Sequence, residues 1–496
     1  MEIGEIVRRA AQRFGPTPAL VFGDRMMTFS ALDKATDRVG NALLAAGLRT
    51  GDRVGVLLPN GIDGLVVFYA LAKAGLVRVP LNVRETAADH AYKLTDSGSR
   101  AVVADKAEDF GVPTITTAFD AATLTSVMAV GPDLPCAVPR HPDVPFRLGY
   151  TGGTTGRPKA VTLSMRCEHA EIASFLIDLL PDVRPGDRML HAAPVVHASG
   201  AFVLPHLIRG ATNIIMDRFD PGRFLEELER QAATATFLVP TMIAMVLDDP
   251  NVGSVKAPAL RRLCYGASPI APALVERAMA AFGPKLAQTY GQAEAPMAIT
   301  CLQPDEHDRI GSAGRPYTLV EVGVVDEEDR PLPPGEEGEV VTRGQHIFAG
   351  YWNRPAETAE VIRDGWVHTG DVGVFDDDGF LYLRDRKSDM IISGGYNVYP
   401  REVEDVLVSH PAVREAAVVG LPDERWGERV HAVVVLREDV AVDDILEFVA
   451  GRMAGFKRPK SGEVWEEPSL PKSPAGKILR RTIKERCRRA GEVAVP

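Results

Sequence analysis

The sequence of 496 residues lacks several features that mark other classes of protein. Its five cysteines are far apart and form no CxxC pair, which argues against a zinc site and against a disulfide-stabilised secreted domain. Positive charge is not in excess, because 56 lysine and arginine residues face 67 acidic residues and leave a net charge of −11. This balance argues against a protein whose main role is to coat nucleic acid. We therefore expect a cytoplasmic protein that has no nucleic-acid partner.

Long apolar runs are also missing. The longest one, residues 64–82, is interrupted by Lys73 and Arg78 within the length that a bilayer-spanning helix needs. The first residues combine apolar side chains at helical spacing with early acidic residues, unlike a secretion signal. We therefore expect no integral membrane association, and we interpret the run as a buried helix followed by a strand.

The length requires more than one domain. Helical periodicity at 29–47 and 63–75 alternates with β-branched strands at 52–59 and 100–105, which predicts βαβ units and a mostly parallel sheet. Short strands with many turns follow at 311–378 and predict a small antiparallel barrel or a meander. The C-terminal part returns to mixed helices and strands. The expected fold class is α/β: a large N-terminal domain of parallel-rich sheets with helices and a small β-barrel, at 1–385, precedes a mobile α+β domain at 386–496.

One glycine-rich stretch, YTGGTTGRPK at 150–159, has the chemistry of a phosphate-binding loop. Glycines allow backbone N–H groups to converge on an anion, threonine hydroxyls add donors, and Lys159 can supply charge to the outer phosphates. The spacing is not that of a Walker loop, because Pro158 precedes the lysine and a strand follows it. Taken alone, the stretch leaves open a hairpin loop without a ligand.

This stretch resembles the phosphate-binding signature of the adenylate-forming superfamily, which contains acyl-CoA synthetases, peptide-synthetase adenylation domains and beetle luciferases. The other signatures of that superfamily follow in order and cover essentially the whole chain: YGASPI at 265–270, QTYGQAE at 288–294, RGQHIFAGYWNRPAET at 343–358, GWVHTGD at 365–371, RDRKSDMIISGGYNVYPREVE at 384–404 and PKSPAGKILRR at 471–481. The chain is most similar to a free-standing fatty-acyl or aryl acyl-CoA ligase.

The resemblance implies that the chain binds ATP and joins a carboxylate to AMP. Lys477 would bridge the carboxylate and the α-phosphate, and Glu294 with Thr154 would hold Mg²⁺, for which carboxylate oxygen is a suitable hard ligand. These three are the implied catalytic residues. The implied ATP or AMP site also contains Thr151, Gly152, Gly153, Thr155, Gly156, Lys159, Gly266, Ala267, Ser268, Gln288, Thr289, Tyr290, Gly291, Gln292, Asp371 and Arg386. Among these, Asp371 would accept the ribose hydroxyls and Tyr290 would offer a face to adenine.

The resemblance also implies a second step, in which the C-terminal domain changes its pose and coenzyme A takes the acyl group. Gly394 and Gly395 match the segment past which the pantetheine arm enters, with an ordinary β-turn as the alternative. The hinge is expected at Ser388. A separate acyl carrier protein is the alternative acceptor. Luciferase-like oxidation and a non-catalytic nucleotide-binding protein also stay open, as does the choice between a monomer and a homodimer.

The acid pocket is the least defined part. The resemblance assigns His197 to its wall, and Ser199, Gly200, Gly266 and Gly291 are the other expected lining residues. These small side chains leave room, which favours a medium or long acyl chain or a bulky ring acid over acetate. No arginine or lysine in the segment around His197 is placed to hold a second carboxylate.

The sequence departs from the superfamily pattern at two positions. Ala293 stands where a threonine is usual, so one hydroxyl that bonds phosphate is missing unless Gln292 or a water replaces it. Ser388 stands where the hinge is usually Asp or Lys; a small polar residue can still absorb the change in backbone angles.

Overall fold

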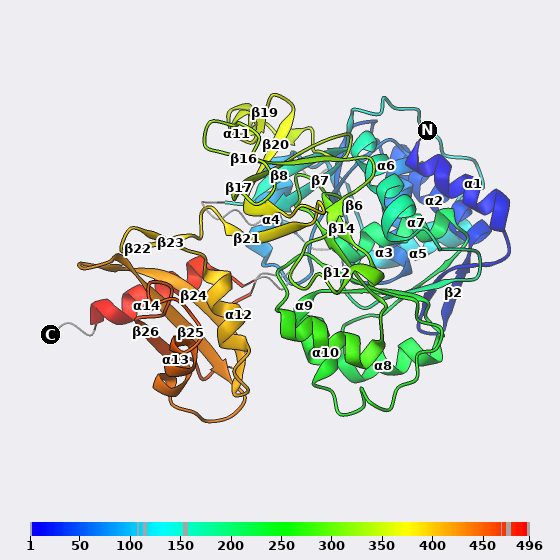
Figure 1. Cartoon of the computed structure of the whole chain (residues 1–496). Coiled ribbons are helices and arrows are strands. Elements are labelled where there is room, and N and C mark those ends of the chain that lie inside the picture. The colour runs from blue at the N-terminus through cyan, green and yellow to red at the C-terminus, as the bar shows by residue number, and fades with distance from the viewer. Residues whose placement is uncertain are drawn as a thin grey trace.

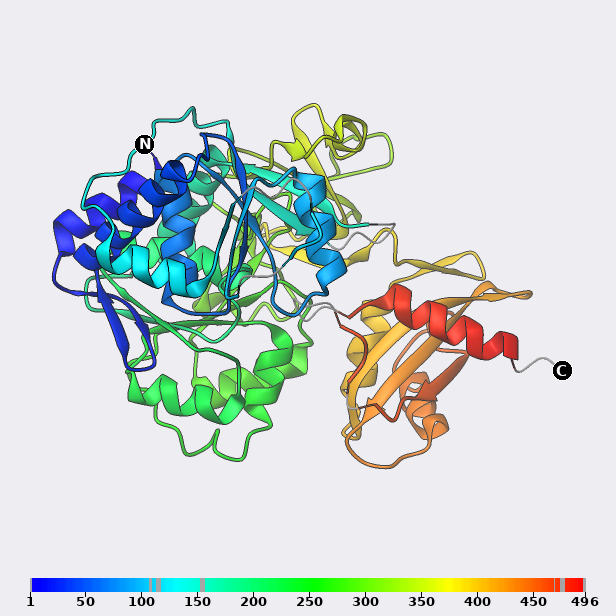
Figure 2. The ribbon, with the colours of Figure 1, turned by 180° about the vertical axis from the view of Figure 1, so that it is seen from behind.

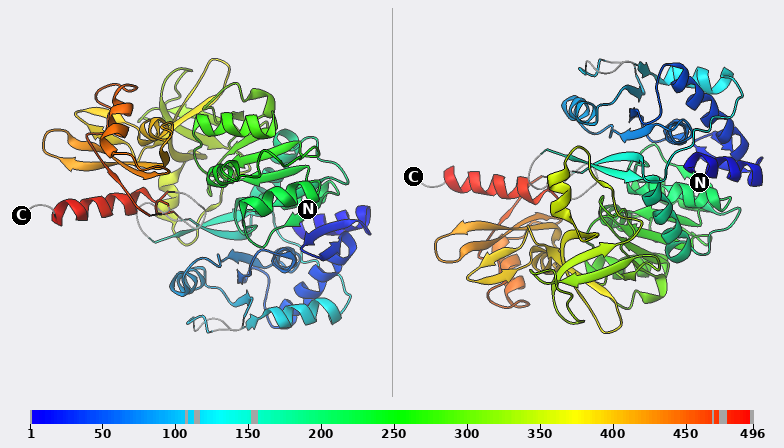
Figure 3. Two further views of the ribbon diagram at one scale, coloured as in Figure 1. Left: turned by 90° about the horizontal axis from the view of Figure 1, so that it is seen from below. Right: turned by 90° about the horizontal axis from the view of Figure 1, so that it is seen from above.

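The computed structural model describes residues 2–106, 109–112, 117–151, 157–467, 469–472 and 478–493. Figure 1 shows a large N-terminal unit and a smaller C-terminal unit, and Figure 2 shows the same two units from behind, with the last helix lying across the smaller one. Within the large unit, the segment coloured blue to cyan and the segment coloured green form two neighbouring lobes (Figure 3). This is the mixed α/β architecture that the sequence predicts.

The first sheet has the strand order β15-β14-β13-β12-β11-β9-β10-β1-β2. From β13 to β1 all neighbours pair in parallel, whereas the strands at both edges are antiparallel. The bounds are β1 Pro18–Phe22, β2 Arg25–Thr28, β9 Arg188–His191, β10 Thr212–Ile215, β11 Ala235–Leu238, β12 Arg262–Gly266, β13 Leu286–Tyr290, β14 Thr300–Leu302 and β15 Arg315–Pro316.

The second sheet has the order β18-β8-β7-β4-β3-β5-β6. Its strands from β7 to β6 are parallel, while β7 and β8 form the antiparallel hairpin on either side of the glycine-rich stretch. The bounds are β3 Arg53–Leu57, β4 Val77–Pro80, β5 Ala101–Ala104, β6 Thr117–Phe119, β7 Pro145–Thr151, β8 Lys159–Ser164 and β18 Gly350–Tyr351.

Helices cover these two sheets. Their bounds are α1 Ile3–Phe14, α2 Phe29–Ala45, α3 Ile62–Lys73, α4 Ala87–Ser97, α5 Ala121–Val130, α6 Met165–Ser174, α7 Val203–Ile208, α8 Pro221–Arg230, α9 Pro240–Leu247 and α10 Pro272–Phe282, with a π-helical turn at Phe175–Leu179 and 3₁₀ turns at Ala198–Phe202 and Pro304–Glu306. Local signals explain several of the ends: Thr86 and Asp89 form a capping box at the start of α4, and Asp220 caps α8 ahead of Pro221.

The apolar run at 64–82 is the buried helix α3 followed by β4, as predicted. Nearly all of α3 is buried, which explains why it is apolar on every side. Lys73, which interrupts the run, lies in the core, and its Nζ donates to Asp33 and, at 2.8 Å, to Asp37. No helix in the described part of the chain has both the length and the apolar character needed to cross a bilayer.

A third sheet, fully antiparallel, holds β16 Glu321–Val325, β17 Gly338–Arg343, β19 Ile362–Arg363, β20 Trp366–Phe375 and β21 Leu381–Arg386, with α11 Pro355–Val361 beside it. The strand β20 is long enough to pair with β17, β19 and β21. Among the described strands β16 pairs only with β17 and β21 only with β20. Of the two arrangements that the sequence leaves open, the strands therefore form an open antiparallel sheet and not a closed barrel.

The C-terminal unit is built on a fourth sheet, in the order β23-β22-β25-β24, with β26 beside β25. Its elements are β22 Ile391–Ser393, β23 Tyr396–Val398, α12 Pro400–Val408, β24 Val413–Asp423, β25 Gly427–Leu436, α13 Val442–Ala450, β26 Ser461–Val464 and α14 Arg480–Val493. Residues 387–390 join this sheet to β21 of the large unit.

Candidate active site

The candidate site lies where β12 and β13 end. Their neighbouring carboxyl ends carry Gly266 and Tyr290, and in open α/β sheets ligands bind beyond such ends. Gly266 has no room for a side chain, because a Cβ there would lie 2.2 Å from the carbonyl oxygen of Thr289. Ala267, the next residue, has a φ of 69°, in the left-handed region that costs a non-glycine residue energy. The chain therefore turns sharply here and leaves Gly266 to Ser268 at the sheet edge.

Asp371, in the middle of β20, is the most closely supported polar group of the site. Its Oδ2 accepts hydrogen bonds from the Tyr290 hydroxyl at 2.6 Å and from Gln292 Nε2 at 2.7 Å. Arg386, its register partner on β21, places Nε 3.4 Å from Oδ1. Burial, and then the Asp371 carboxylate, raise the pKa of Tyr290 well above its usual value, so the hydroxyl stays a donor. Asp371 is thus oriented from three sides.

Tyr290 belongs to a buried apolar cluster that contains Ile299, Val324 and Leu381. Its hydroxyl is committed to Asp371. The sequence could not reveal these neighbours, because Val324 and Leu381 come from the third sheet. The role of its ring toward adenine stays a prediction.

Three further predicted residues of this segment are also held by packing. Gln288 Oε1 accepts from the Tyr265 hydroxyl at 3.0 Å, and the buried Thr289 Oγ1 contacts the Tyr317 hydroxyl at 2.9 Å. At Gly291 a Cβ would lie 2.4 Å from the Met297 nitrogen. The side-chain hydroxyl of Thr289 and the amide oxygen of Gln288 are therefore held by neighbouring tyrosines, and the roles of both residues toward a nucleotide stay predictions.

The position of Ala293 bears on the missing hydroxyl. Ala293 packs against an apolar cluster that contains Phe348, and Gln292 cannot supply the lost donor. Both hydrogens of its amide are in use, because Nε2 donates to the Thr369 carbonyl at 2.8 Å as well as to Asp371. Of the two substitutes considered for the absent threonine, only a water is left.

Glu294 lies between the first two sheets. Its backbone carbonyl accepts from Phe348 N at 2.8 Å, and its Oε1 accepts from the Tyr351 hydroxyl at 2.8 Å. Lys159 Nζ lies 5.1 Å from the centroid of the Tyr351 ring. The second carboxylate oxygen of Glu294, Oε2, accepts no hydrogen bond from the described residues. A half-buried carboxylate with one unused oxygen beside the glycine-rich hairpin fits a Mg²⁺ ligand.

The hairpin itself is only partly described. Thr151 ends β7 and pairs with Lys159, which begins β8, so the stretch between them leaves from the edge of the second sheet. Gly152, Gly153, Thr154, Thr155 and Gly156 lie outside the described residues. Lys477 also lies outside them.

The predicted acid-pocket residues are separated by the structure. His197 and Gly200 line a cavity of about 20 Å³ beside α3 and α6, whereas Gly266 and Gly291 are not among its lining residues. Ser199 is fully buried and bonds His191 Nδ1 at 2.9 Å, so its predicted place in the pocket wall is wrong. The side chain points into the core because the 3₁₀ turn at Ala198–Phe202 directs it toward β9.

His197 has a partner that the sequence does not reveal. Asn82 Nδ2 lies 2.6 Å from His197 Nε2, and the Asn82 carbonyl contacts His90 Nε2 at 2.8 Å. Burial lowers the pKa of His197, so the neutral imidazole accepts the Asn82 amide proton at neutral pH. Asn82 is the polar last residue of the apolar run at 64–82, and this position is the signal that could have pointed to it.

The joint between the units is tied by charges. Ser388 lies between Lys387 and Asp389. The backbone nitrogen of Lys387 donates to the Gly370 carbonyl at 2.8 Å. Arg480, at the start of α14, bonds Glu404 at 2.6 Å and Asp389 at 3.2 Å, and it approaches Asp385 to 3.6 Å. Arg480 therefore contacts residues on both sides of Ser388.

Gly394 and Gly395 form the two-residue turn of the β22–β23 hairpin. Their φ angles are 61° and 82°, which a tight hairpin of this kind requires. A Cβ on Gly394 would lie 2.8 Å from the Trp426 ring. The turn alone accounts for both glycines, so a role toward coenzyme A stays a prediction.

Comparison with known families agrees with this architecture. The model of the AMP-binding enzyme family matches residues 7–352, and that of the AMP-binding enzyme C-terminal domain matches residues 402–477. The chain belongs to the AMP-binding enzyme family, within the adenylate-forming superfamily that its motifs resemble.

Individual relatives span almost the whole chain. It is 36% identical to the medium/long-chain-fatty-acid–CoA ligase FadD8 of Mycobacterium tuberculosis, over 97% of this chain and 90% of that protein. It is 38% identical to the fatty acid–[acyl-carrier-protein] ligase ScoC of Streptomyces coeruleorubidus, over 96% and 94%. The o-succinylbenzoate CoA synthetase of Bacillus subtilis, solved with its acyl-adenylate intermediate, superposes with a TM-score of 0.88 at 31% identity and covers 97% of each chain.

Proposed function

We propose that the protein is an AMP-forming ligase that uses ATP to join a carboxylic acid to coenzyme A. The observation that carries the proposal is the triply held carboxylate of Asp371, beside the ends of β12 and β13 and in a chain of this family. A carboxylate can accept two neighbouring ribose hydroxyls, and Tyr290, Gln292 and Arg386 keep this one fixed before the nucleotide arrives. The backbone of Gly266 to Ser268 would line the purine.

In the proposed first step, a carboxylate oxygen attacks the α-phosphorus of ATP and pyrophosphate leaves. Both reactants are anions, so positioning and cationic stabilisation must supply most of the rate. We assign the outer phosphates to the residues from Thr151 to Lys159. Lys477, a compact charge on a long stem, would bridge the carboxylate and the α-phosphate.

Glu294 and Thr154 are the residues that would hold Mg²⁺. The unused oxygen of Glu294 supports this assignment, and Tyr351 orients the carboxylate from the other side. When bound, Mg²⁺ would neutralise charge on the phosphates. Tyr351 holds the Glu294 carboxylate, while the Phe348 amide fixes the backbone of Glu294 through its carbonyl oxygen.

In the proposed second step, the thiol sulfur of coenzyme A attacks the acyl carbonyl and AMP leaves. We propose a boundary between the 1–385 and 386–496 units, with a hinge at Ser388 that changes the pose of the C-terminal unit between the steps. Gly394 and Gly395 would leave space for the pantetheine arm. A separate acyl carrier protein is the alternative acceptor, which the likeness to ScoC favours.

The test is a panel of fatty, aryl and dicarboxylic acids supplied with ATP and Mg²⁺, and with either coenzyme A or a carrier protein. We expect AMP and an acyl-CoA thioester from at least one acid, identified by mass spectrometry. Thioester formed only on the carrier protein would support the alternative acceptor. Absence of AMP with every acid and either acceptor would contradict the ligase function.

Glu294→Gln is expected to raise the Mg²⁺ concentration needed for half-maximal pyrophosphate release at least about tenfold, because a neutral amide is a poorer ligand for a hard cation. Glu360→Gln, on the exposed side of α11, is the matched control and should leave this concentration unchanged. A Glu294→Gln variant that is slower but has an unaltered Mg²⁺ dependence would argue against the assignment.

A further inference from the structure

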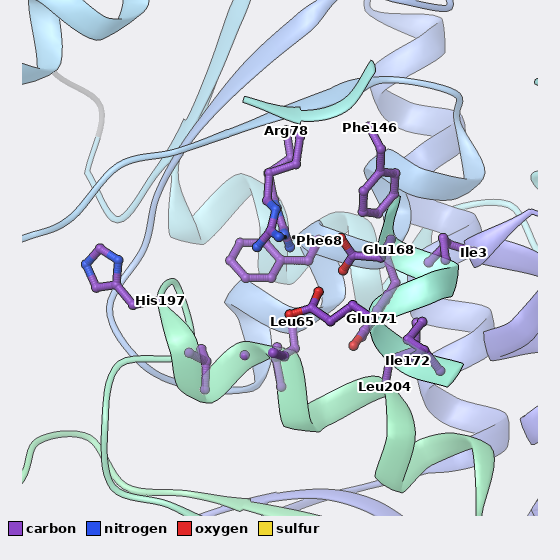
Figure 4. A pocket seen from close by; sticks show the side chains of 15 residues that line it. Ile3, Leu65, Phe68, Arg78, Phe146, Glu168, Glu171, Ile172, His197 and Leu204 are labelled. Carbon is purple, nitrogen blue, oxygen red and sulfur yellow. Dashed lines mark ion pairs between the residues drawn. The ribbon is translucent and has the colours of Figure 1, made fainter. Parts of the chain in front are cut away.

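The cavity beside His197 contains charged side chains that come together from distant parts of the chain. Figure 4 shows Arg78 from β4 at one side and Glu168 and Glu171 from α6 at the other, between apolar walls that include Phe68 and Leu204. Its volume of about 20 Å³ holds about one water molecule. A pocket for a plain acyl chain does not need such groups.

Arg78 stands out because its guanidinium forms no ion pair with a described carboxylate, although Glu168 and Glu171 lie near enough to raise its pKa. Its guanidinium carbon lies 4.1 Å from the centroid of the Phe68 ring, and its Nε is buried without a hydrogen-bond partner. Within the described residues, no carboxylate oxygen lies within ion-pair distance of the Arg78 guanidinium. Burial lowers the pKa of Arg78 to about 10, so the group is still protonated at neutral pH.

The neighbouring charged groups leave Arg78 without a close counterion. Arg147, the register partner of Arg78, faces Glu168 at 3.6 Å, so these two groups form a pair of their own. Burial, and then Glu168, raise the pKa of Glu171, which makes it a weak counterion for Arg78. Arg78 is thus a cation at this cavity without an ion-pair partner among the described residues. Leaving a cation buried and unpaired is costly, and an anionic ligand would remove that cost.

The strand β7 relates Arg78 to the nucleotide site, because Arg147 of β7 is the register partner of Arg78. Arg147 and Thr151 lie on the same strand, about 13 Å apart at the usual rise per residue. Thr151 is where the glycine-rich stretch begins. His197 and Gly200, the wall residues expected for the acid, line the same cavity as Arg78. An acid that reacts at one end near the phosphates would therefore extend toward Arg78 with its other end.

We propose that Arg78 binds the far carboxylate of a dicarboxylic acid, so that the protein activates one end of a substrate whose other end is also an anion. The inference rests on the proposed ligase function and narrows its substrate class. The proposal replaces the expected fatty or ring acid by a dicarboxylic acid. Nothing in the sequence pointed to a second carboxylate, because the segment around His197 contains no arginine or lysine. Arg78 reaches this cavity from a different part of the chain, the strand β4. A guanidinium suits this role because it can donate two parallel hydrogen bonds to a carboxylate.

The test compares saturated dicarboxylic acids of increasing length with their monomethyl esters, which have almost the same shape and lack the far charge. At the best length, kcat/KM for the diacid should exceed that for the ester about 10- to 100-fold, the range for a hydrogen bond to a charged group. Arg78→Met should reduce this ratio to about one. Arg209→Met, an exposed arginine that ends the helix carrying Leu204, is the control and should keep the ratio.

A second measurement, the rise in Tm that each compound causes, does not depend on turnover. The diacid should stabilise the wild type more than the ester does, and the Arg78→Met variant should lose this difference. Arg78→Lys, which keeps the charge, should retain part of it and serves if the methionine variant does not fold. Equal ratios in wild type and variant, by both measurements, would overturn the proposal and leave Arg78 as a structural residue that packs on the Phe68 ring. If no acid forms a thioester but the Tm difference depends on Arg78, the ligase function fails while the binding site stands.

Discussion

Lys477→Ala is expected to lower acyl-adenylate formation at least about a hundredfold, the scale on which removal of a single group that stabilises the transition state acts. The acid and the triphosphate repel each other, and the superfamily pattern assigns to this lysine the charge that bridges them. The same variant should convert a supplied acyl-adenylate and coenzyme A to thioester at close to the wild-type rate, since the α-phosphate has by then been attacked. Pyrophosphate release and thioester formation measure the two steps separately.

Lys484→Ala is the matched control for this experiment. Lys484 lies on α14, a short way along the same basic segment, and its Nζ bonds Glu428 at 2.9 Å on the surface of the C-terminal unit. Its loss should leave both steps unchanged. If Lys477→Ala slowed both steps equally, the role assigned to Lys477 in the first step would be wrong.

Asp371→Asn is expected to raise the KM for ATP about 10- to 100-fold, with a smaller effect on kcat. The amide has nearly the shape of the carboxylate, but it brings a donor into a place where Tyr290 and Gln292 already donate. It also removes the charge opposite Arg386 and the acceptor for a second ribose hydroxyl. Initial rates across a range of ATP concentrations would separate the two constants.

The control for this variant is Asp377→Asn, at an exposed position just after β20. Asp377→Asn should melt close to the wild type, whereas Asp371→Asn should melt lower, because a buried acceptor of two hydrogen bonds is replaced in part by a donor. An unchanged KM for ATP in Asp371→Asn would exclude Asp371 from the nucleotide site, whatever the effect on kcat.

Much of the fold could be predicted because its signals are local. Helices such as α2 and α8 follow from their apolar spacing, and the parallel sheets follow from strands that alternate with helices. The order of motifs along the chain pointed to the family in the same way. Each of these signals lies within a short window of sequence.

The groups that the sequence did not reveal depend on contacts between windows. Tyr351 reaches Glu294 because β18 pairs with β8, and Asn82 reaches His197 from another sheet. Ser199 was misplaced for a related reason, since spacing alone does not tell which side of a 3₁₀ turn faces the core. Arg78 was visible in the sequence as a charged residue within a buried apolar strand. Its role could not be predicted, because the residues around its guanidinium come from α3 and α6.

Arg480 has a mechanical consequence if the unit that carries it swings about Ser388. It holds Glu404 and Asp389 on its own side, and it approaches Asp385 on the other. A swing would keep the first two contacts and break the third in every cycle. The guanidinium would then form a reversible contact between the two units, and the C-terminal unit would carry the segment just before α14 with it when it moves. The strength of this one ionic contact, which is largely shielded from solvent, would influence how long the C-terminal unit stays in the orientation that the structure shows.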